Sequence, residues 1–417
     1  MNKKLGVQWC LHMSLMMAVL SSTVLTGCDI QFKSKALKGS GQTVKKQEAL
    51  SEFSKVKLSV PFDLILTQAT NADAKVDLNV EGDSAFLDLV EYVVEGDTLL
   101  IRWKNKSQHF YFNVEQMPKI NLSMAKLDAI EQSSSGDIYI NNWKQEQLKL
   151  VVHGSGDIKM NGKIGQFDIE NNGSADVDAT GLEVAQLMFT GHGSGNLNLG
   201  TLTKTAQVAV NGSGDVKLKK VQLESFKLSS HGSGDVFVEG NSKQVDVELN
   251  GSGELKAHFL QMEQATLTSH GSGEIELSGE VNKLVAKLNG SGDLKADNLA
   301  VKNVDLEVHG TGNTQLKGVS ETAQLNFHGS GDFTSSLKQA EQIELTSSGT
   351  SEVHFSGQAK RLKANLQGSG DIQAYDLVLD SASISITGTS VAYLSVKKSG
   401  DAGVRKMSIN RSGSSEQ

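Results

Sequence analysis

Histidine and aspartate side chains recur at fixed distances along this chain, and both can hold a metal ion. Imidazole nitrogens bind Zn²⁺ and other transition metals, whereas carboxylate oxygens bind Ca²⁺. The histidines lie 39 residues apart, at His153, His192, His231, His270 and His309. The aspartates that directly follow a Gly-Ser-Gly turn include Asp157, Asp215, Asp235 and Asp293. The two series must therefore be tested as metal sites before they are read as surface features.

The spacing argues against metal binding by the histidines. If each repeat is one coil of a stacked fold, residues 39 apart lie two coils apart, roughly 10 Å along the stack. Two imidazoles at that distance cannot share one ion, and only His309 and His328 fall in adjacent coils. Asparagines such as Asn211 and Asn250 lie midway between the histidines. The alternation predicts a hydrogen-bonded surface ladder.

Calcium binding by the aspartates stays open as an alternative. Calcium-binding β-rolls repeat their glycine-aspartate turns at a nonapeptide period, whereas this chain has one turn per 19 or 20 residues. A stacked acidic column would repel itself by on the order of 1 kcal/mol per adjacent pair in water. We predict that water solvates the column and that nearby lysines, such as Lys217 and Lys256, relieve the repulsion. The sequence predicts no metal and no cofactor.

The turns form a regular series when the residue after the second glycine is taken as a marker. The spacing between markers alternates between 20 and 19 residues, which makes a 39-residue unit of two coils. A period of this kind is typical of a solenoid built by tandem duplication. The markers are Asp137, Asp157, Asp176, Asn196, Asp215, Asp235, Glu254, Glu274, Asp293, Asn313, Asp332, Glu352 and Asp371.

The segments between turns read as strands. In "QVDVELN" and "GDVKLKK" apolar and polar residues alternate with period two, as in a half-buried strand. A coil of about 20 residues cannot bury its apolar face alone, so coils stack. We predict an all-β fold, a single-stranded parallel β-helix of 19/20-residue coils, and favour the right-handed form. The turn glycines fall at inward positions, where backbone approaches closely or takes a φ that suits glycine.

The N-terminus reads as a bacterial lipoprotein signal. Lys3 and Lys4 precede an apolar run, and "LTGC" ends at Cys28, which we expect to be the lipidated first residue of the mature chain. The predicted layout is a signal peptide (1–28), a polar tether (29–50), a β-rich head with the first coils (51–128), β-helix repeats (129–396), and a cap and tail (397–417). An ordinary signal peptide with an incidental cysteine is the alternative.

Charge and cysteine content bound the partners. The net charge of -8 over 417 residues makes nucleic acid an unsuitable partner, because phosphate binding needs a concentrated basic face. The chain has 2 cysteines, and Cys10 leaves with the signal, so no disulfide is expected. We expect a location in the bacterial envelope, anchored to a bilayer through Cys28. Asp29 favours the periplasmic side of the inner membrane, although the outer membrane stays open.

The first half of the chain resembles a known family. The segments "GSGQTVKKQEALSEFSKVKLSVPFDLILTQA", "VDLNVEGDSAFLDLVEYVVEGDTLLIRWKN" and "PKINLSMAKLDAIEQSSSGDIYI" occur in this order before the repeated turns. This order resembles the head GIN domain family of bacterial envelope proteins, which are labelled autotransporter adhesins. The resemblance implies a single-stranded β-helix, an envelope location and no catalytic residues. The thirteen or so turns of this chain exceed what the family typically shows.

We expect an adhesin-like binding or display module that presents a repeated polar surface to a glycan, another polymer or a protein. A purely structural envelope spacer is the main alternative. A carbohydrate-active β-helix enzyme is a third, but it would need an irregular cluster of acidic and basic residues in the coils. The 4 arginines, Arg102, Arg361, Arg405 and Arg411, form no such cluster in the sequence, and no catalytic residues are predicted.

Overall fold

The structure is a computed structural model, and it describes residues 35–71, 74–105, 110–113, 117–397, 403–411 and 413–416. Cys28 and the expected signal peptide lie outside these residues. Strand β1 (Lys35–Lys38) pairs in parallel with β8 (Phe110–Asn113), and these two belong to one compact unit. Residues 39–105 and 114–417 belong to a second unit, which is described below. No helix among the described residues is long and apolar enough to cross a bilayer.

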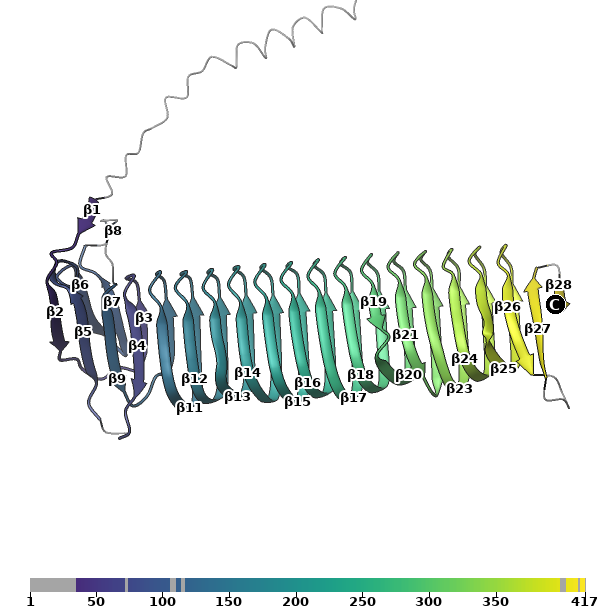
Figure 1. The fold of residues 1–417 in the computed structure, drawn as a ribbon, viewed down its shortest axis with the longest axis horizontal. Helices are drawn as coiled ribbons and strands as arrows, with labels where there is room; N and C mark the ends of the chain where they lie inside the picture. Colours follow the sequence, from purple (N-terminus) through teal and green to yellow (C-terminus); the bar gives the residue numbers. More distant parts are fainter. Residues whose placement is uncertain are drawn as a thin grey trace, which may run out of the picture. The chain divides into compact units, whose positions relative to one another are not determined.

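The second unit is a β-solenoid of about 13 turns, which confirms the predicted fold class (Figure 1). Each strand pairs in parallel with the strand of the next coil. The stacked strands are β3 (Lys55–Leu58), β4 (Asp63–Gln68), β10 (Ala129–Gln132), β11 (Ile138–Val152), β12 (Ile158–Asn171), β13 (Val177–Gly191), β14 (Leu197–Val210), β15 (Val216–Ser230), β16 (Val236–Leu249), β17 (Leu255–Ser269), β18 (Ile275–Leu288), β19 (Leu294–Ala296), β20 (Leu299–Val308), β21 (Thr314–Val319), β22 (Thr322–Phe327), β23 (Phe333–Ser347), β24 (Val353–Leu366), β25 (Ile372–Ile386) and β26 (Ala392–Lys397).

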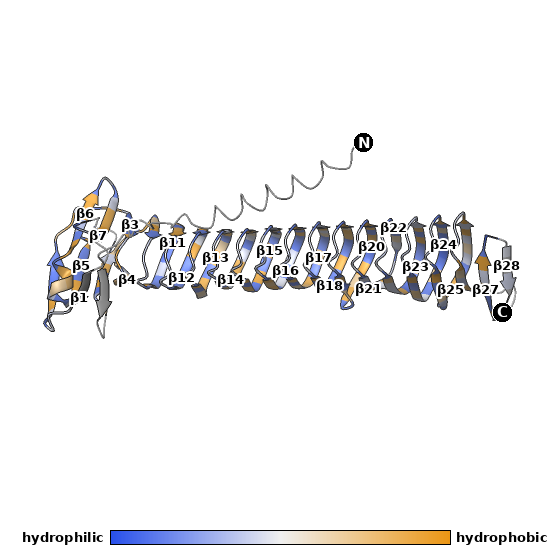
Figure 2. Ribbon diagram, turned by 90° about the horizontal axis from the view of Figure 1, so that it is seen from above, coloured by the Kyte–Doolittle hydropathy of each residue, from blue (hydrophilic) through white to orange (hydrophobic). Residues whose placement is uncertain are grey.

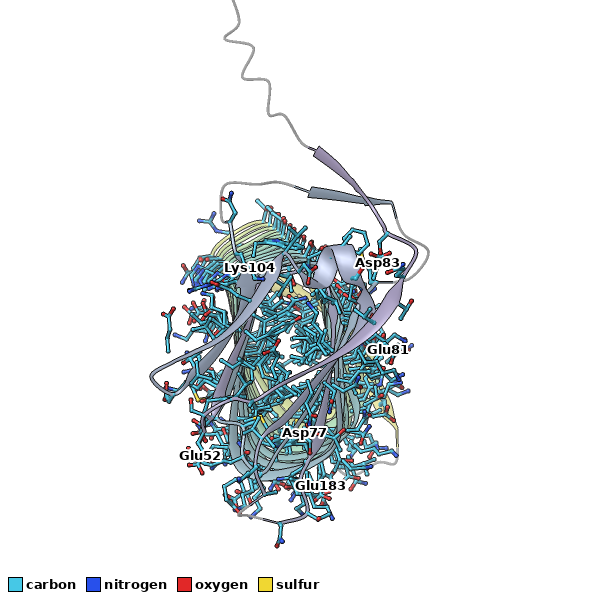
Figure 3. All side chains as sticks on the ribbon, turned by 90° about the vertical axis from the view of Figure 1, so that its left-hand side faces the viewer. Glu52, Asp77, Glu81, Asp83, Lys104 and Glu183 are labelled. Carbon is cyan, nitrogen blue, oxygen red and sulfur yellow. The ribbon has the colours of Figure 1, made fainter. Side chains whose placement is uncertain are left out.

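The core follows from the period-two alternation of the strands. In β17, Leu255, Ala257 and Phe259 are buried, while Lys256 and His258 between them are partly exposed. The residue after each marker forms one of the inward columns, so that apolar side chains stack on one another along the interior. Figure 2 shows the alternation of apolar and polar residues along the strands, and Figure 3 looks along the stack. This column includes Ile158, Val177, Leu197, Val216, Val236, Leu255 and Ile275.

The turn glycines are required by close approach of neighbouring coils. A Cβ on Gly251, the first glycine of its turn, would lie 1.8 Å from the carbonyl oxygen of Gly232 in the preceding coil. A Cβ on Gly253, the second glycine, would lie 2.2 Å from the oxygen of Gly234. Neither glycine has a φ in the left-handed region, so the sequence alternative of a special φ does not apply here.

The alternation between 19 and 20 residues arises at the corner opposite the turn. Between β15 and β16, Leu218 pairs with Val238, 20 residues on, but Val221 pairs with Gly240, only 19 residues on. The next pair of strands reverses the change. Every second coil therefore carries one extra residue in this corner, and Lys220 takes a φ of 53° there. The two-coil unit read from the sequence is thus a difference in corner length.

The N-terminal end of the stack is closed by an excursion between β4 and β10. It comprises β5 (Asp77–Asp83), α2 (Ser84–Leu87), β6 (Val90–Glu95), β7 (Thr98–Trp103) and β9 (Lys119–Met124). Strands β7 and β9 return to pair with β3 and β4, and β2 (Thr43–Glu48) pairs antiparallel with β5. At the other end, β27 (Val404–Asn410) and β28 (Gly413–Glu416) continue the sheet in antiparallel fashion.

A carboxylate clasp holds the start of this unit. Asp83, labelled in Figure 3, accepts hydrogen bonds from the Ser40 amide (3.0 Å), the Ser40 hydroxyl (2.7 Å), the Gly41 amide (2.8 Å) and the Ala85 amide (2.9 Å). Desolvation opposes ionisation of this carboxyl, but these hydrogen bonds outweigh it and lower the pKa of Asp83 to about 2.

The glycine requirement predicts unequal effects at the two turn positions. Gly251→Ala should destabilise its coil by about 2–3 kcal/mol because the methyl group overlaps backbone. Gly253→Ala should cost about 1 kcal/mol or less, since Ala175 already occupies the same position in another coil. Native-state amide exchange of the coils around residues 232–271 measures both, because solenoids need not unfold in two states. Equal protection in the two variants would contradict the explanation.

The clasp predicts a specific acid response. The folded pKa of Asp83 is lower than the roughly 3.9 of an unfolded aspartate, so its stabilisation is complete above pH 4 and is lost as the pH falls towards 2. The Ser40 and Gly41 amide resonances should shift with a midpoint near 2. A midpoint near 4, or the same titration in Asp83→Asn, would rule the clasp out.

Candidate functional site

The turns place three polar columns side by side on one edge of the solenoid, here called the glycine–serine edge. The imidazole–amide column begins each turn, the hydroxyl column follows two residues later, and the marker column follows after two more. The imidazole–amide column contains His153, Asn172, His192, Asn211, His231, Asn250, His270, Asn289, His309 and His328. The hydroxyl column contains Ser155, Ser174, Ser194, Ser213, Ser233, Ser252, Ser272, Ser291, Thr311, Ser330, Thr350, Ser369 and Thr389.

Backbone hydrogen bonds between coils fix this edge. The amide of Ser233 donates to the carbonyl oxygen of Gly212 at 3.0 Å, and the amide of His231 donates to Val210 at 2.8 Å. The same bonds recur in the neighbouring turns, for example from Ser252 to Gly232 at 3.1 Å. The side chains of the edge therefore stand on a backbone that is already hydrogen-bonded along the stack.

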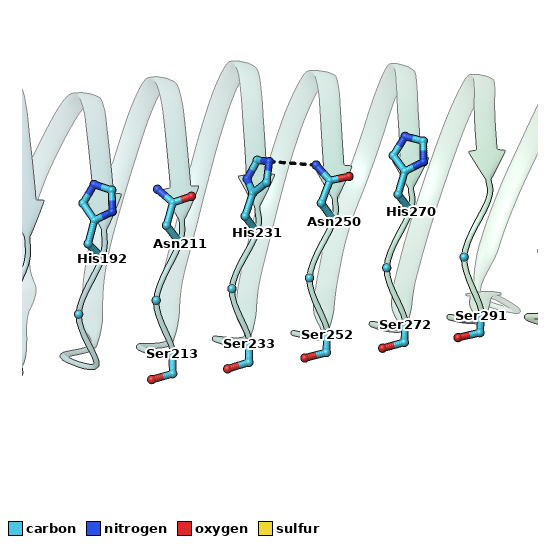
Figure 4. Close-up of a pocket in the computed structure, with 16 residues that line it drawn as sticks. His192, Asn211, Ser213, His231, Ser233, Asn250, Ser252, His270, Ser272 and Ser291 are labelled. Atoms are coloured by element: carbon cyan, nitrogen blue, oxygen red, sulfur yellow. Dashed lines mark hydrogen bonds between the residues drawn. The ribbon is translucent and has the colours of Figure 1, made fainter. Parts of the chain in front are cut away.

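A shallow groove of about 870 Å³ runs along the edge between the imidazole–amide and hydroxyl columns. Its floor is the backbone of the first turn glycines, which carry no side chain to fill it. Figure 4 shows the imidazoles and amides on one side and the serine hydroxyls on the other, with the hydroxyls all pointing the same way. The groove extends from His192 to Ser291, and no lysine, arginine, aspartate or glutamate lines it.

Within the imidazole–amide column, side chains of adjacent coils hydrogen-bond to each other. The Asn250 amide nitrogen donates to Nε2 of His231 at 3.1 Å and to Glu248 at 2.8 Å (Figure 4). The Asn289 amide nitrogen lies 3.3 Å from Nδ1 of His270. An imidazole nitrogen that accepts a hydrogen bond leaves the other nitrogen as the N–H donor. Each of these histidines therefore keeps one donor for a ligand.

The predicted contact of His309 and His328 is present. Their rings stack with centroids 4.7 Å apart and an interplanar angle of 17°. His309 also lies 2.8 Å from Glu307, and His328 lies 2.7 Å from the Ser348 hydroxyl. Among the residues that the structure describes, no group of three or more His, Cys, Asp and Glu side chains could hold a metal ion.

The marker column differs from the solvated column that the sequence suggested. The Asp215 carboxylate accepts a hydrogen bond from the backbone amide of Asp235 at 2.9 Å, and Asp235 accepts one from Glu254 at 2.8 Å. Asp157 and Asp293 make the same bond to the markers of the following coils, at 3.1 and 2.7 Å. Each of these carboxylates thus spends one oxygen on the stack, which sequence reasoning missed because it treated the column as surface only.

Glutamate markers behave differently because their side chains are longer. Glu254 pairs with Lys256 at 2.8 Å and Glu274 with Lys295 at 2.6 Å, and none of the glutamate markers in the described chain bonds the next marker amide. The hydrogen bond from Glu254 raises the pKa of Lys256, and that from Glu274 raises the pKa of Lys295. Lysine therefore relieves the acidic column, as expected at Lys256, mainly where the marker is a glutamate.

The ladder also begins one coil earlier than the sequence series. Asp63 accepts from the amide of Asp137 at 3.3 Å, so it is the marker of the first coil. No glycine precedes it, and the excursion places 74 residues between the two markers. The combination of an aspartate with a following apolar strand, "FDLIL", is the only sequence signal for this position.

The marker ladder predicts a sharp contrast between two variants. Asp215→Ala should expose the Asp235 amide to exchange and cost about 1–2 kcal/mol, because a backbone donor loses its acceptor. Asp215→Asn should change little, since Asn196 already accepts from Asp215 at 2.8 Å. Hydrogen exchange of the Asp235 amide separates the two. If both variants exchange like the unmodified protein, the marker side chains do not support the stack.

Comparisons with solved structures give matches at low identity. A "putative lipid binding protein" from Parabacteroides distasonis is 15% identical, with 87% of this chain and 100% of that chain covered and a TM-score of 0.31. A "putative adhesin" from Bacteroides fragilis is 16% identical (85% and 99% covered, TM-score 0.26), and one from Parabacteroides merdae is 12% identical (88% and 100%, TM-score 0.25). No curated protein matches the chain.

The sequence model of one family matches most of the chain. It is described as "Putative auto-transporter adhesin, head GIN domain", and it matches residues 52–242, 220–336 and 314–409. The three matches overlap and together extend from β3 into β27, so they include the later coils as well as the first half in which the sequence resemblance was strongest. The chain therefore belongs to the head GIN domain family of auto-transporter adhesin-like proteins.

Proposed function

We propose that this protein is a lipid-anchored cell-envelope protein whose glycine–serine edge is an adhesin-like binding surface. The observation that carries the proposal is the groove of about 870 Å³, in which the same hydrogen-bonding side chains recur on a fixed backbone. A repeated and pre-ordered surface loses little entropy on binding and engages an extended ligand at many points. Membership in an adhesin-like family supports this role.

The anchor rests on the N-terminal sequence. The "LTGC" tetrapeptide places Cys28 where bacterial lipoproteins are cleaved and lipidated, and Asp29 favours retention at the inner membrane. The tether at 29–50 contains several lysines, which would favour an anionic bilayer surface modestly. One lipid-bearing cysteine thus supplies the membrane partner, and the solenoid supplies the surface presented to other envelope components.

A structural spacer is the second candidate, and the ends of the stack favour it. Open β-edges invite end-to-end association, and natural proteins block them. Here antiparallel strands close both ends, β5 with β9 at the start and β26 with β27 at the finish. A closed rod of this kind would serve as a spacer without using its lateral surface, so the two candidates differ in whether the groove is needed.

Lipidation of Cys28 is tested by replacement of the thiol. In cells labelled with a fatty-acid probe, the protein should carry the label and sediment with membranes. Cys28→Ala should lose the label, because no thiol remains to accept the lipid, and the protein should no longer sediment. Cys10→Ala is the matched control and should behave like the unmodified protein. An unlabelled protein with an intact Cys28 would contradict the anchor.

The binding role is tested by placing charge in the groove. Ser213→Glu with Ser252→Glu adds two carboxylates between the columns, and Gln222→Glu with Gln261→Glu adds the same charge on exposed positions of the opposite corner. Only the groove variant should lose retention of envelope material from the source cells. Equal retention by both variants and the unmodified protein would favour the spacer.

A further inference from the structure

We infer that the groove binds a single strand of a linear, uncharged β-linked polysaccharide laid along the solenoid. This inference rests on the proposed function, because it assigns a ligand class to the glycine–serine edge. It depends on three features of the groove: its length and period, the chemistry of its lining, and the charges that flank it.

The shape fits a polymer strand rather than a small molecule. The groove follows the stack across six turns, from His192 to Ser291, which is about 24 Å at ~4.8 Å per coil. It is shallow and open at both ends, so a small ligand would leave most of its own surface exposed. Histidines repeat every second coil, at roughly 10 Å, which is similar to the two-sugar repeat of an extended β-linked glycan. One disaccharide would therefore meet an equivalent set of side chains in each two-coil unit.

The lining presents hydrogen-bonding groups that match sugar hydroxyls. Serine hydroxyls donate and accept, asparagine amides supply both donors and acceptors, and each imidazole retains one N–H. The glycine floor lets a flat ring approach the backbone closely, because no side chain rises between the columns. The groove has no aromatic platform other than its imidazoles. Affinity must therefore come from many weak contacts, and it should grow steeply with chain length.

The flanking charges exclude acidic polymers. Beside the groove, the marker column is acidic at Asp215, Asp235, Glu254, Glu274 and Asp293. No lysine or arginine lines the groove to offset it, and the whole chain carries a net charge of -8. A polyanion would be repelled along the full length of the stack. An uncharged strand meets no such barrier.

Peptides and lipids fit the groove less well. An extended peptide binds a sheet by pairing with free backbone groups, but the turn amides here already donate to the neighbouring coil, as Ser233 does to Gly212 at 3.0 Å. A lipid tail needs an apolar floor, and the residues that line this groove are histidine, asparagine, serine and glycine. A hydroxyl-rich polymer is the class that uses what the groove offers.

The test is calorimetric or electrophoretic binding of purified protein to defined glycans. Cellohexaose and chitohexaose represent the predicted ligand, cellobiose the short chain, maltohexaose a helical backbone, and polygalacturonate an acidic polymer. The predicted order is binding of one or both extended hexasaccharides, and much weaker binding of the other three. Equal binding of maltohexaose or polygalacturonate would overturn the inference, as would length-independent binding.

Two variants tie binding to the groove. Replacing Ser213, Ser233, Ser252 and Ser272 by alanine should weaken binding at least about tenfold, or about 1.4 kcal/mol. The control replaces Ser225, Ser278 and Ser336, which lie outside the groove, and should bind normally. Deleting residues 212–250 removes one 39-residue unit, joins Asn211 to Gly251, and should weaken binding of long chains while keeping the fold. Unchanged binding in the serine variant would overturn the inference.

The outcomes separate this inference from the proposed function. If no glycan binds but the groove carboxylates still abolish retention of envelope material, the ligand class is wrong and the binding role stands. If envelope material is retained regardless of the groove and no glycan binds, both fail.

Discussion

Everything on the glycine–serine edge depends on how closely one coil's backbone passes the next. The position that a Cβ of Gly251 would occupy lies 1.8 Å from the carbonyl oxygen of Gly232, so any larger residue would push the coils apart. That approach lets the turn amides donate to the preceding coil, as Ser252 does to Gly232 at 3.1 Å. Because the turn is part of the ladder rather than a loop between ladders, its side chains stand in register over the whole stack.

The same constraint explains why one short motif can be both structural and available for binding. The first glycine satisfies the packing and leaves an open floor, while the side chains on either side project to solvent. The marker aspartates divide their two oxygens, since one accepts from the next marker amide, as Asp215 does from Asp235. Only the imidazole–amide and hydroxyl columns are left with unused hydrogen-bonding capacity. The candidate surface is therefore a by-product of the turn that the fold requires.

Much of this could be predicted from the sequence, because period-two strands and evenly spaced turns are local signals that repeat. The contact between His309 and His328 followed from counting alone. Three features could not be read in this way. Asp63 is separated from Asp137 by an excursion, so its place in the ladder depends on tertiary pairing. The corner near Lys220 absorbs the length difference without a distinctive residue type. The marker hydrogen bonds depend on where a carboxylate points, which a surface-exposed position does not reveal.

Hydroxyl-radical footprinting tests the central claim most directly, because the edge carries its own reporters. His192, His231 and His270 line the groove, whereas Met188, which is 49% exposed, is an oxidisable side chain outside it. When envelope material from the source cells is added, oxidation of the three histidines should fall while that of Met188 stays unchanged. Protection of Met188 with unprotected histidines would place the ligand on another face, and it would contradict the account of the glycine–serine edge as the binding surface.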